Sequence, residues 1–463
     1  MNKSKIAIIG LAVMGQNLAR NIANNGHKIS VYNRTTKVMN EFIDEYGSEN
    51  LEGYEDLCTL AKSLEKPRII GLMIKSGPAI DSVIESITQF LEDGDIIVDF
   101  GNSNYQDTIK REKKLKEKNL KFFGCGVSGG EEGALNGPSL MPGGDKETYE
   151  CIEPILKSIA AKDFKGKDCV TYLGQDGSGH YLKMVHNGIE YGIMQMMAEV
   201  YGILKNGFGL KAGEISKIFA NYNEGKLKSY LCEIAVPILA KKEGEDYLID
   251  KVLDSAAQKG TGRLTAIESL ERGVGLSVIT QSVYARVYSS FKNTRTELSK
   301  LYEKGTHKIE DDLEEFTKIL ENALYIGVII SYAQGFRLLE VASDEQNWDL
   351  NFSEISRIWQ GGCIIRAKVL ESFETLFVSG EKNLLKMPEV AKYINENIDD
   401  LRYVVGLSAM NALPTLSLSS ALNSFEYITQ ERSTANFIQG LRDYFGAHTF
   451  KRTDKEGTFH SEW

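Results

Sequence analysis

The first third of the chain alternates short apolar runs with amphipathic segments. The runs have the length of buried strands, and the segments between them have the spacing of helices. The strand-like runs are KIAIIG (5–10), KISVYN (28–33), RIIGLMI (68–74), DIIVDF (95–100) and LKFFGCGV (120–127). Strands that alternate with helices are typical of a parallel sheet covered on both faces. This part of the chain is therefore predicted to be an α/β domain with a Rossmann-like, doubly wound sheet.

The pattern changes after the glycine-rich segment 174–179. Beyond it the strands largely stop, and we expect an all-α domain of long helices. Within this region AEVYGILK (198–205) resembles AQGFRLLE (333–340), and EISKIF (214–219) resembles EISRIW (354–359), in the same order and at nearly the same offset. Chance similarity between helical sequences is the alternative. The matches predict an internal duplication, with two similar helical units stacked on each other.

The end of the chain differs again, because residues 442–463 show no apolar period and their aromatic side chains stand among charges. A frayed terminus is one interpretation. The aromatic residues are costly to expose, however, so we expect an extended tail that docks on a partner subunit; they are Tyr444, Phe445, Phe450, Phe459 and Trp463. The domains predicted are residues 1–178 for the sheet, 179–440 for the helices and 441–463 for the tail.

A glycine-rich turn joins the first predicted strand to a helix. GLAVMG (10–15) fits the pattern G-x-G-x-x-G, with Ala12 in the place of the second glycine. In such a turn the first glycine allows the tight bend, and the helix amides that follow receive a pyrophosphate. The residues predicted to hold a dinucleotide here are Gly10, Ala12, Val13, Met14 and Gly15.

The end of the second strand distinguishes between the two nicotinamide dinucleotides. An NAD site has Asp or Glu there to bind the ribose 2′-hydroxyl, whereas this chain has Asn33, Arg34 and Thr35. The guanidinium of Arg34 suits a phosphate, and its two neighbours can donate hydrogen bonds without repelling one. A surface arginine in a β–α turn is the alternative. We expect NADP as the cofactor.

Two further strand ends carry polar turns. MIKSG (73–77), with Ile74 and Lys75, follows the third run, and GNS (101–103) follows the fourth. Ligands of such sheets bind at the carboxyl ends of the strands. Asn102 is therefore a candidate for contact with the nicotinamide amide, although all these residue types are also ordinary in turns.

The segment VSGGEEGALNGPSLMPGG (127–144) is dense in glycine. Ser128, Gly129 and Gly130 offer a hydroxyl and consecutive backbone amides, which can hold a carboxylate. A flexible loop is the alternative. Because the segment follows a strand, it is expected to open at the same edge of the sheet as the cofactor.

The stretch KMVHNGIEYG (183–192) reads as a helix whose polar side chains share one face. These are Lys183, His186, Asn187, Glu190 and Tyr191, at the spacing where a helix usually carries its apolar stripe. A nicotinamide oxidises an alcohol, and the hydroxyl proton needs a base. Lys183 can be that base if burial lowers its pKa, and Glu190 can be a separate acid. A buried polar network that joins two helices is the alternative.

Composition and charge exclude several classes of function. The 463 residues carry a net charge of −10, so a general affinity for nucleic acid or an anionic membrane is not expected. The six cysteines are scattered and show no zinc-ligand spacing, so no metal is expected and the thiols read as reduced. The chain enters its first strand without a signal peptide, and no apolar run approaches the ~20 residues of a membrane helix. We expect a cytoplasmic protein.

Several of these segments together resemble one family. They are GLAVMGQNLARN, YNRT, GNS, GVSGGEEGALNGPSLMPGG, KMVHNGIEYG, QKGTGR, RDYFGAHTF and RTDKEG. The chain is similar to 6-phosphogluconate dehydrogenase, the decarboxylating enzyme of the pentose phosphate pathway. One departure is Arg263-Leu264 after QKGTG, where an aromatic-containing KW is expected, so local packing there is in question.

The resemblance implies the reaction and the roles of the residues. 6-Phosphogluconate is oxidised at C3 by NADP, the 3-keto acid loses CO2, and the enediol is protonated at C1 to give ribulose 5-phosphate, without a metal. Lys183 matches the base and Glu190 the final acid. The residues implied to bind the substrate are Asn102, Ser128, Gly129, Gly130, His186, Asn187, Tyr191, Lys259, Thr261, Arg286, Arg442 and His448. Arg442 and His448 match residues that a neighbouring subunit's tail delivers, which implies a homodimer.

Two rival functions stay open at this point. A different β-hydroxyacid dehydrogenase could use the same scaffold, although such chains are usually shorter and lack the duplicated unit and the tail. A protein that binds NADPH without catalysis, as a sensor or structural component, is the other. The presence of Lys183 and Glu190 argues against the second rival.

Overall fold

The sheet domain has the α/β architecture that the apolar pattern predicts. The computed structural model describes residues 3–302 and 308–463. Seven strands pair in the order β3-β2-β1-β4-β5-β6-β7, all parallel except the last pair. The strands are β1 (Ile6–Ile9), β2 (Ile29–Tyr32), β3 (Leu51–Gly53), β4 (Ile69–Leu72), β5 (Ile96–Asp99), β6 (Lys121–Ser128) and β7 (Ser139–Gly144). The prediction of a doubly wound sheet is confirmed.

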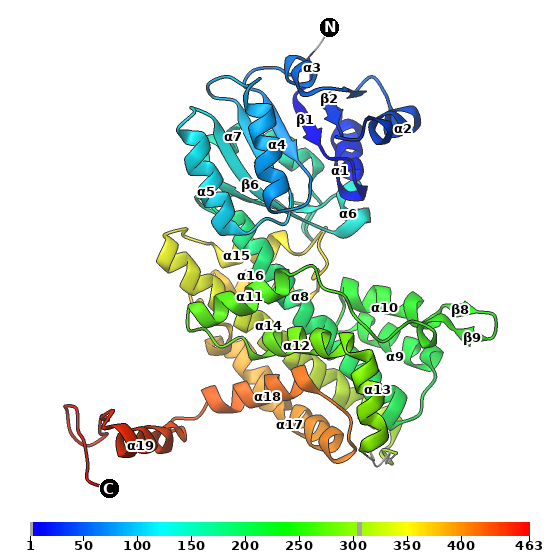
Figure 1. The fold of residues 1–463 in the computed structure, drawn as a ribbon. Coiled ribbons are helices and arrows are strands. Elements are labelled where there is room, and N and C mark those ends of the chain that lie inside the picture. The colour runs from blue at the N-terminus through cyan, green and yellow to red at the C-terminus, as the bar shows by residue number, and fades with distance from the viewer. Residues whose placement is uncertain (1–2, 303–307) are drawn as a thin grey trace.

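Helices cover both faces of this sheet (Figure 1). They are α1 (Val13–Asn24), α2 (Thr36–Tyr46), α3 (Leu57–Lys62), α4 (Pro78–Thr88), α5 (Tyr105–Lys116), α6 (Gly130–Asn136) and α7 (Lys146–Ile159). Side chains of α1, α2 and α7 form one apolar layer with the sheet, and those of α3, α4 and α5 form the other. Apolar residues therefore face both ways from the central strands, as in a parallel sheet that is buried on both sides.

Two strands were not expected. β3 is only three residues long, and β7 lies inside the glycine-rich segment 127–144. The alternative of a flexible loop does not hold for this segment, because it contains the end of β6, all of α6 and all of β7. Pro142 and the glycines of β7 resemble turn signals. They are tolerated because β7 is an edge strand, where proline costs no central ladder bond.

The helical domain follows directly, and the chain runs into it through one long helix. The elements are α8 (Ser178–Gly202), a π-helical turn η1 (Ile203–Gly207), α9 (Ala212–Glu224), α10 (Tyr230–Ala240), a hairpin of β8 (Lys242–Glu243) and β9 (Asp246–Tyr247), a 3₁₀ turn η2 (Leu248–Asp250), α11 (Thr261–Glu271), α12 (Ser277–Ser290), α13 (Lys292–Leu301), α14 (Leu313–Gln346), α15 (Phe352–Ile358), α16 (Val369–Phe377), a 3₁₀ turn η3 (Leu384–Lys386), α17 (Pro388–Met410), α18 (Leu416–Ile428) and α19 (Ala435–Gly446).

The duplicated segments occupy corresponding places in this domain. The long helix α8 is followed by α9 and α10, and the long helix α14 is followed by α15 and α16. α8 and α14 pack closely through small residues: a Cβ added to Gly192 would lie 2.7 Å from Ser331 Oγ, and one added to Gly335 would lie 2.5 Å from Ile189 Cδ1. The two units are therefore stacked through their long helices.

α14 is the central helix of the helical core. Among the described residues it alone is long and apolar enough to cross a membrane, and 78% of its most apolar window is buried inside the protein. The expectation that no apolar run approaches that length is too strong for α14. Burial by neighbouring helices accounts for its composition, since a core helix is apolar on all sides.

The first turns of α8 lie directly on the sheet. A Cβ added to Gly126 of β6 would lie 2.5 Å from Lys183 Cβ, and one added to Gly124 would lie 2.9 Å from His180 Nδ1. Gly143 of β7 likewise approaches the backbone of Gly179 too closely for any side chain. Glycines on the strands thus bring the helix against the sheet and bring Lys183 to the carboxyl end of β6.

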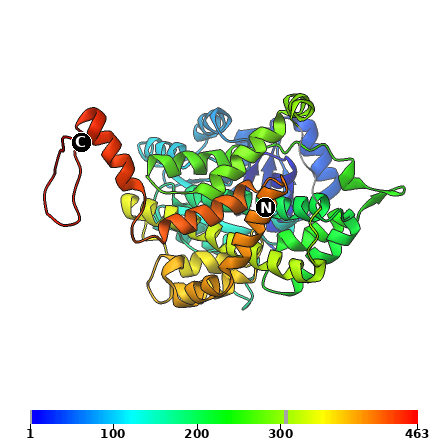
Figure 2. The same cartoon turned by 90° about the horizontal axis from the view of Figure 1, so that it is seen from below.

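The chain ends in a C-terminal arm, residues 429–463, which projects away from both domains (Figures 1 and 2). The arm contains α19, so the predicted boundary at residue 441 lies inside a helix. Beyond α19 the chain folds back through a bridge between Phe450 and Phe459. The buried carboxylate of Asp443 holds the fold by accepting hydrogen bonds from Thr449 N (2.9 Å), Ser461 N (3.1 Å) and Trp463 Nε1 (2.9 Å).

Close helix packing predicts opposite effects for two alanine substitutions in α8. A Cβ at Gly188 would lie 2.6 Å from Thr265 Cγ2 of α11, whereas one at Gly202 meets nothing within 4 Å. Gly188→Ala should lower the free energy of unfolding by about 1–3 kcal/mol through overpacking. Gly202→Ala should raise it by about 0.5–1 kcal/mol, since alanine favours helix. Urea unfolding measures both, and equal effects would contradict this packing.

Candidate active site

The glycine-rich turn has the geometry of a dinucleotide-binding turn. Gly10 has φ +103°, and a Cβ there would collide with Ile74 and the carbonyl of Met73. A Cβ at Gly15 would collide with the carbonyl of Gly10. No side chain caps the first turn of α1, where Ala12 is the N-cap and no acidic residue follows. The N-terminal amides of α1 are therefore available to an anion.

Arg34 lies exposed at the carboxyl end of β2. In the described part of the chain its guanidinium has no hydrogen bond and no ion pair, and the first turn of α2 carries no acidic residue. Asn33 has a structural task at this strand end that the sequence did not indicate. Its Oδ1 accepts from Leu11 N at 3.1 Å and its Nδ2 donates to the carbonyl of Thr35 at 3.1 Å, so it ties the glycine turn to β2.

The other strand ends meet at the same edge. Ile74 contacts Gly10, whereas Lys75 is exposed. Asn102 is exposed on a turn that Asp99 fixes, because the buried carboxylate accepts from Gly101 N at 2.9 Å and from Ser103 Oγ at 2.6 Å. Asp99 was not predicted, although a carboxylate at the end of an apolar strand is a signal that could have found it.

Three side chains of the polar face of α8, Lys183, His186 and Asn187, lie within hydrogen-bond distance of one another. Asn187 Nδ2 donates to Thr261 Oγ1 at 3.1 Å, so its Oδ1 faces His186 Nδ1 at 3.0 Å as an acceptor. This pattern assigns the proton of His186 to Nδ1, which leaves Nε2 to accept from Ser128 Oγ at 3.2 Å. Lys183 Nζ lies 3.5 Å from the same Nδ1, which cannot accept from it. The amine of Lys183 is thus left available.

Burial sets the protonation of this face. It lowers the pKa of Lys183 to about 8, although Glu190 opposes the shift. Burial also lowers the pKa of His186 well below its usual range, and Lys183 adds to the effect. Burial raises the pKa of Glu190, while Lys183, Arg286 and Lys259 oppose it. An amine and a carboxyl therefore lie on one helix face, with the pKa of each moved towards neutrality.

A second group of residues lies beside the end of this face. The guanidinium of Arg286, on α12, stacks 3.5 Å from the ring centroid of Tyr191 and donates to the carbonyl of Ala257 at 3.1 Å. Lys259 is exposed on the same loop as Ala257, and Thr261 begins α11. The first turn of α11 packs against the ring of Tyr191. This close approach requires Gly262, where a Cβ would lie 2.5 Å from the ring.

The remaining predicted residues have separate positions. Gly129 (φ +113°) and Gly130 (φ +64°) follow Ser128, and a Cβ at Gly129 would lie 2.6 Å from the carbonyl of Gly362. Arg442 and His448 lie on the C-terminal arm, so the structure does not bring them to Lys183 of the same chain (Figure 1). At the departure from the family pattern, Arg263 is exposed and Leu264 packs against the helical core.

The segment after α15 was missed altogether. The ring of Trp359 packs edge-on against His186 with centroids 5.7 Å apart, and the thiol of Cys363 donates to the carbonyl of Trp359 at 3.1 Å. Cys363 is also near enough to Lys183 for each to influence the pKa of the other. Nothing in the local sequence points to this contact, because the two partners are far apart along the chain.

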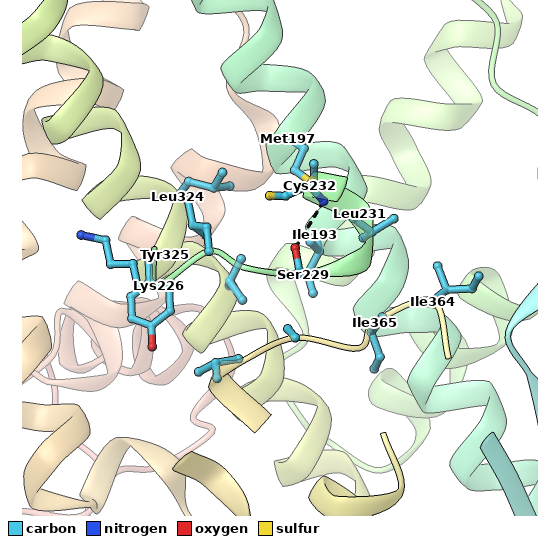
Figure 3. Close-up of a pocket in the computed structure, with 14 residues that line it drawn as sticks. Ile193, Met197, Lys226, Ser229, Leu231, Cys232, Leu324, Tyr325, Ile364 and Ile365 are labelled. Atoms are coloured by element: carbon cyan, nitrogen blue, oxygen red, sulfur yellow. Dashed lines mark hydrogen bonds between the residues drawn. The ribbon is translucent and has the colours of Figure 1, made fainter. Parts of the chain in front are cut away.

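An enclosed cavity in the helical domain is not a substrate site. It lies between α8, α10, α14 and residues 364–369 and has a volume of about 20 Å³ (Figure 3). Its wall is mainly apolar, and the hydroxyl of Ser229 is engaged by Cys232 N at 3.3 Å. That space suits about one water molecule. The polar face of α8 is therefore the better candidate for chemistry.

A dinucleotide turn with an available amine at the same sheet edge is typical of a nicotinamide-dependent dehydrogenase. The profile of the NAD binding domain of 6-phosphogluconate dehydrogenase matches residues 5–174, and that of its C-terminal domain matches residues 179–463. The chain therefore belongs to the 6-phosphogluconate dehydrogenase family.

Similar proteins agree with this assignment over their whole length. The decarboxylating 6-phosphogluconate dehydrogenase of Klebsiella pneumoniae is 48% identical, with 100% of both chains covered. The NADP(+)-dependent decarboxylating enzyme of Bacillus subtilis is 47% identical, again over 100% of both. The solved structure of Plasmodium falciparum 6-phosphogluconate dehydrogenase, described in its apo form and with NADP+ and 6-phosphogluconate, has a TM-score of 0.95 and 43% identity, covering 99% of this chain and 100% of that one.

The unpaired guanidinium of Arg34 predicts the cofactor preference. Arg34→Ala should raise the Kd for NADP by about 10-fold to 100-fold and leave that for NAD nearly unchanged, since a charge-assisted hydrogen bond contributes about 1.5–3 kcal/mol. Lys37→Ala, one residue into α2, removes the same charge nearby and should change neither. Fluorescence titration measures all four constants. An equal loss for both cofactors would refute a 2′-phosphate contact.

Proposed function

We propose that the protein catalyses the NADP-dependent oxidative decarboxylation of 6-phosphogluconate to ribulose 5-phosphate, CO2 and NADPH. The observation that carries the proposal is the buried, available amine of Lys183 at the carboxyl end of β6, on the same edge of the sheet as the dinucleotide turn. Membership of the family supports the choice of substrate. The residues present fit NADP: the α1 amides suit the pyrophosphate, and Arg34 suits the 2′-phosphate.

Lys183 and Glu190 divide the proton transfers between them. Bound NADP supplies the hydride acceptor for C3 of the substrate. Lys183 takes the proton from the C3 hydroxyl as the carbonyl forms, and it returns that proton to the C3 oxygen when the bond to CO2 breaks. The resulting enediol needs a proton on carbon, and Glu190 donates it while Lys183 again takes the hydroxyl proton. Burial supports both roles, because it favours the neutral forms of an amine and a carboxyl.

The substrate is held by groups on three sides. The hydroxyl of Ser128 and the amides of Gly129 and Gly130 bind its carboxylate, with His186, Asn187 and Asn102 next to its hydroxyls. The phosphate binds among Tyr191, Lys259, Thr261 and Arg286. Local cations thus hold an anion on a chain whose net charge is −10.

The working unit is a homodimer in which each C-terminal arm completes the site of the other subunit. Arg442 and His448 are the residues delivered. The shape of the arm supports this arrangement, because α19 exposes an apolar face that no part of its own described chain covers: Phe437, Ile438, Leu441, Tyr444 and Phe445. All six cysteines are free thiols, which agrees with action in the reducing cytoplasm.

Reduction of NADP with 6-phosphogluconate, followed as absorbance of NADPH, tests the proposal. The protein should turn over rapidly with NADP and much more slowly with NAD. Lys183→Met should retain NADP binding but lose turnover by about 10²-fold or more, since the base is removed. Lys205→Met, which removes a half-buried lysine that pairs with Asp250 just beyond α8, should retain turnover. Normal turnover of Lys183→Met would refute the assignment of the base.

The pKa of Lys183 predicts the pH dependence of kcat/KM. The base must be neutral, and with a pKa of about 8 only roughly a tenth of it is neutral at pH 7. kcat/KM should therefore rise with pH and level off above about pH 8. The substrate phosphate titrates near pH 6, so its effect is separable. If kcat/KM instead rose only near pH 6 and was constant above pH 7, Lys183 would not be the base.

A further inference from the structure

The helix that leads into the C-terminal arm is capped by a residue from another helix. α18 begins at Leu416, and its own N-cap, Thr415, makes no side-chain cap hydrogen bond. Glu199 of α8 supplies the acceptor instead. Its Oε1 accepts from Ser417 N at 2.8 Å and its Oε2 from Leu418 N at 2.9 Å. Two first-turn amides that a helix leaves unpaired are thus satisfied from a distant part of the chain.

The capping contact is buried and fully engaged. Glu199 is 4% exposed, and Gln195 Nε2 donates to its Oε1 at 3.0 Å. Burial raises the pKa of Glu199, while the three donors that face it in the described structure oppose this shift by favouring the ionised carboxylate, which accepts only. Loss of an acceptor here would leave amides buried without a partner, which is costly.

Glu199 lies on the same helix as the proposed catalytic residues. α8 carries Lys183 and Glu190 towards the sheet and Glu199 nearer its other end. From Leu416, α18 runs to Ile428, where the arm begins, and α19 then carries Arg442 (Figure 1). The position of the first turn of α18 on α8 therefore helps to set the direction in which the arm leaves the body.

We propose that Glu199 is a positioning residue that aims the C-terminal arm of its own subunit at the active site of the partner. It touches neither substrate nor cofactor. It acts through α18 on the placement of Arg442 and His448 in the other subunit. This inference rests on the shared site in the proposed function.

Steady-state kinetics give the first test. Glu199→Gln places an N–H group where an acceptor is needed, so it should raise KM for 6-phosphogluconate by about tenfold to a hundredfold, as a displaced binding group does. The Kd for NADP should stay within about twofold, because that site lies on the sheet domain. Gln195→Leu, which removes only the third donor, should shift KM in the same direction by a smaller factor.

A matched control separates positioning from stability. Asp312 caps α14 through Glu315 N at 2.9 Å and lies outside the path from α8 to the arm. Asp312→Ala should lower the thermal midpoint without changing KM. If Asp312→Ala raised KM as much as Glu199→Gln does, the role of Glu199 would be general stability and the inference would be overturned.

Mixed dimers give the decisive test. Glu199→Gln and Lys183→Met chains are unfolded together and refolded as an equal mixture. Activity is then measured at a 6-phosphogluconate concentration near the KM of the wild-type protein. In a mixed dimer, the body of the Glu199→Gln chain keeps Lys183 and receives a normally aimed arm from the Lys183→Met chain. About half of randomly paired dimers are mixed, each with one working site of two, so about a quarter of wild-type activity should return. Each parent refolded alone should stay low.

A second mixture tests the shared site itself. Arg442→Ala with Lys183→Met should complement for the same reason, whatever Glu199 does. If this pair recovers activity and the Glu199→Gln pair does not, then Glu199 acts within its own subunit or on folding, and the inference is wrong. If neither pair recovers, the shared site fails and the inference fails with it. Turnover of the wild-type protein independently tests the proposed reaction.

Discussion

The close approach of α8 to the sheet is the contact on which the rest of the structure depends. Glycines at positions 124, 126 and 143 remove the side chains that would otherwise separate helix and strands. The helix can then carry residues of the helical domain to the carboxyl ends of the strands, where the dinucleotide turn also lies. Gly188 and Gly192 allow the same close approach on other faces of α8. The helices α11 and α14 therefore also pack directly against α8. One helix thus joins the sheet edge that holds the dinucleotide turn, the polar face with Lys183 and Glu190, and the helical core.

The same burial that builds this axis creates its chemistry at a cost in stability. A buried lysine without a carboxylate partner is destabilising while it is protonated. Its folded pKa of about 8 lies below the ordinary value of 10.5, so the folded state binds fewer protons than the unfolded chain between these values, and stability from this group rises with pH across that range. The close packing at the glycines of the sheet and the apolar core offset this loss of stability. A polar stripe on the most buried helix is thus tolerated because the surrounding packing is extensive.

Periodicity predicted the α/β domain, the long helices and the polar face of α8, because each depends on residues near one another in sequence. The sequence also located the glycine turn and the exposed Arg34, because each follows directly from its position at a strand end. β7 was not, because Pro142 and its glycines suggest a turn until a neighbouring strand pairs with them. Asp99 was overlooked although a signal was present. Trp359, Cys363 and Glu199 act through partners hundreds of residues away or on another helix, and no local pattern encodes such contacts.

The folded end of the arm affects how two subunits would come together. Burial raises the pKa of Asp443, but hydrogen bonds from His460, Trp463 and backbone amides outweigh that effect and hold it at about 2. The carboxylate therefore stays ionised at any ordinary pH. Its hydrogen bonds keep the chain beyond α19 folded back on the helix. An arm that is already folded before association would lose less conformational entropy on docking than a disordered peptide would. In the proposed dimer, assembly would then be the docking of two surfaces that are already folded.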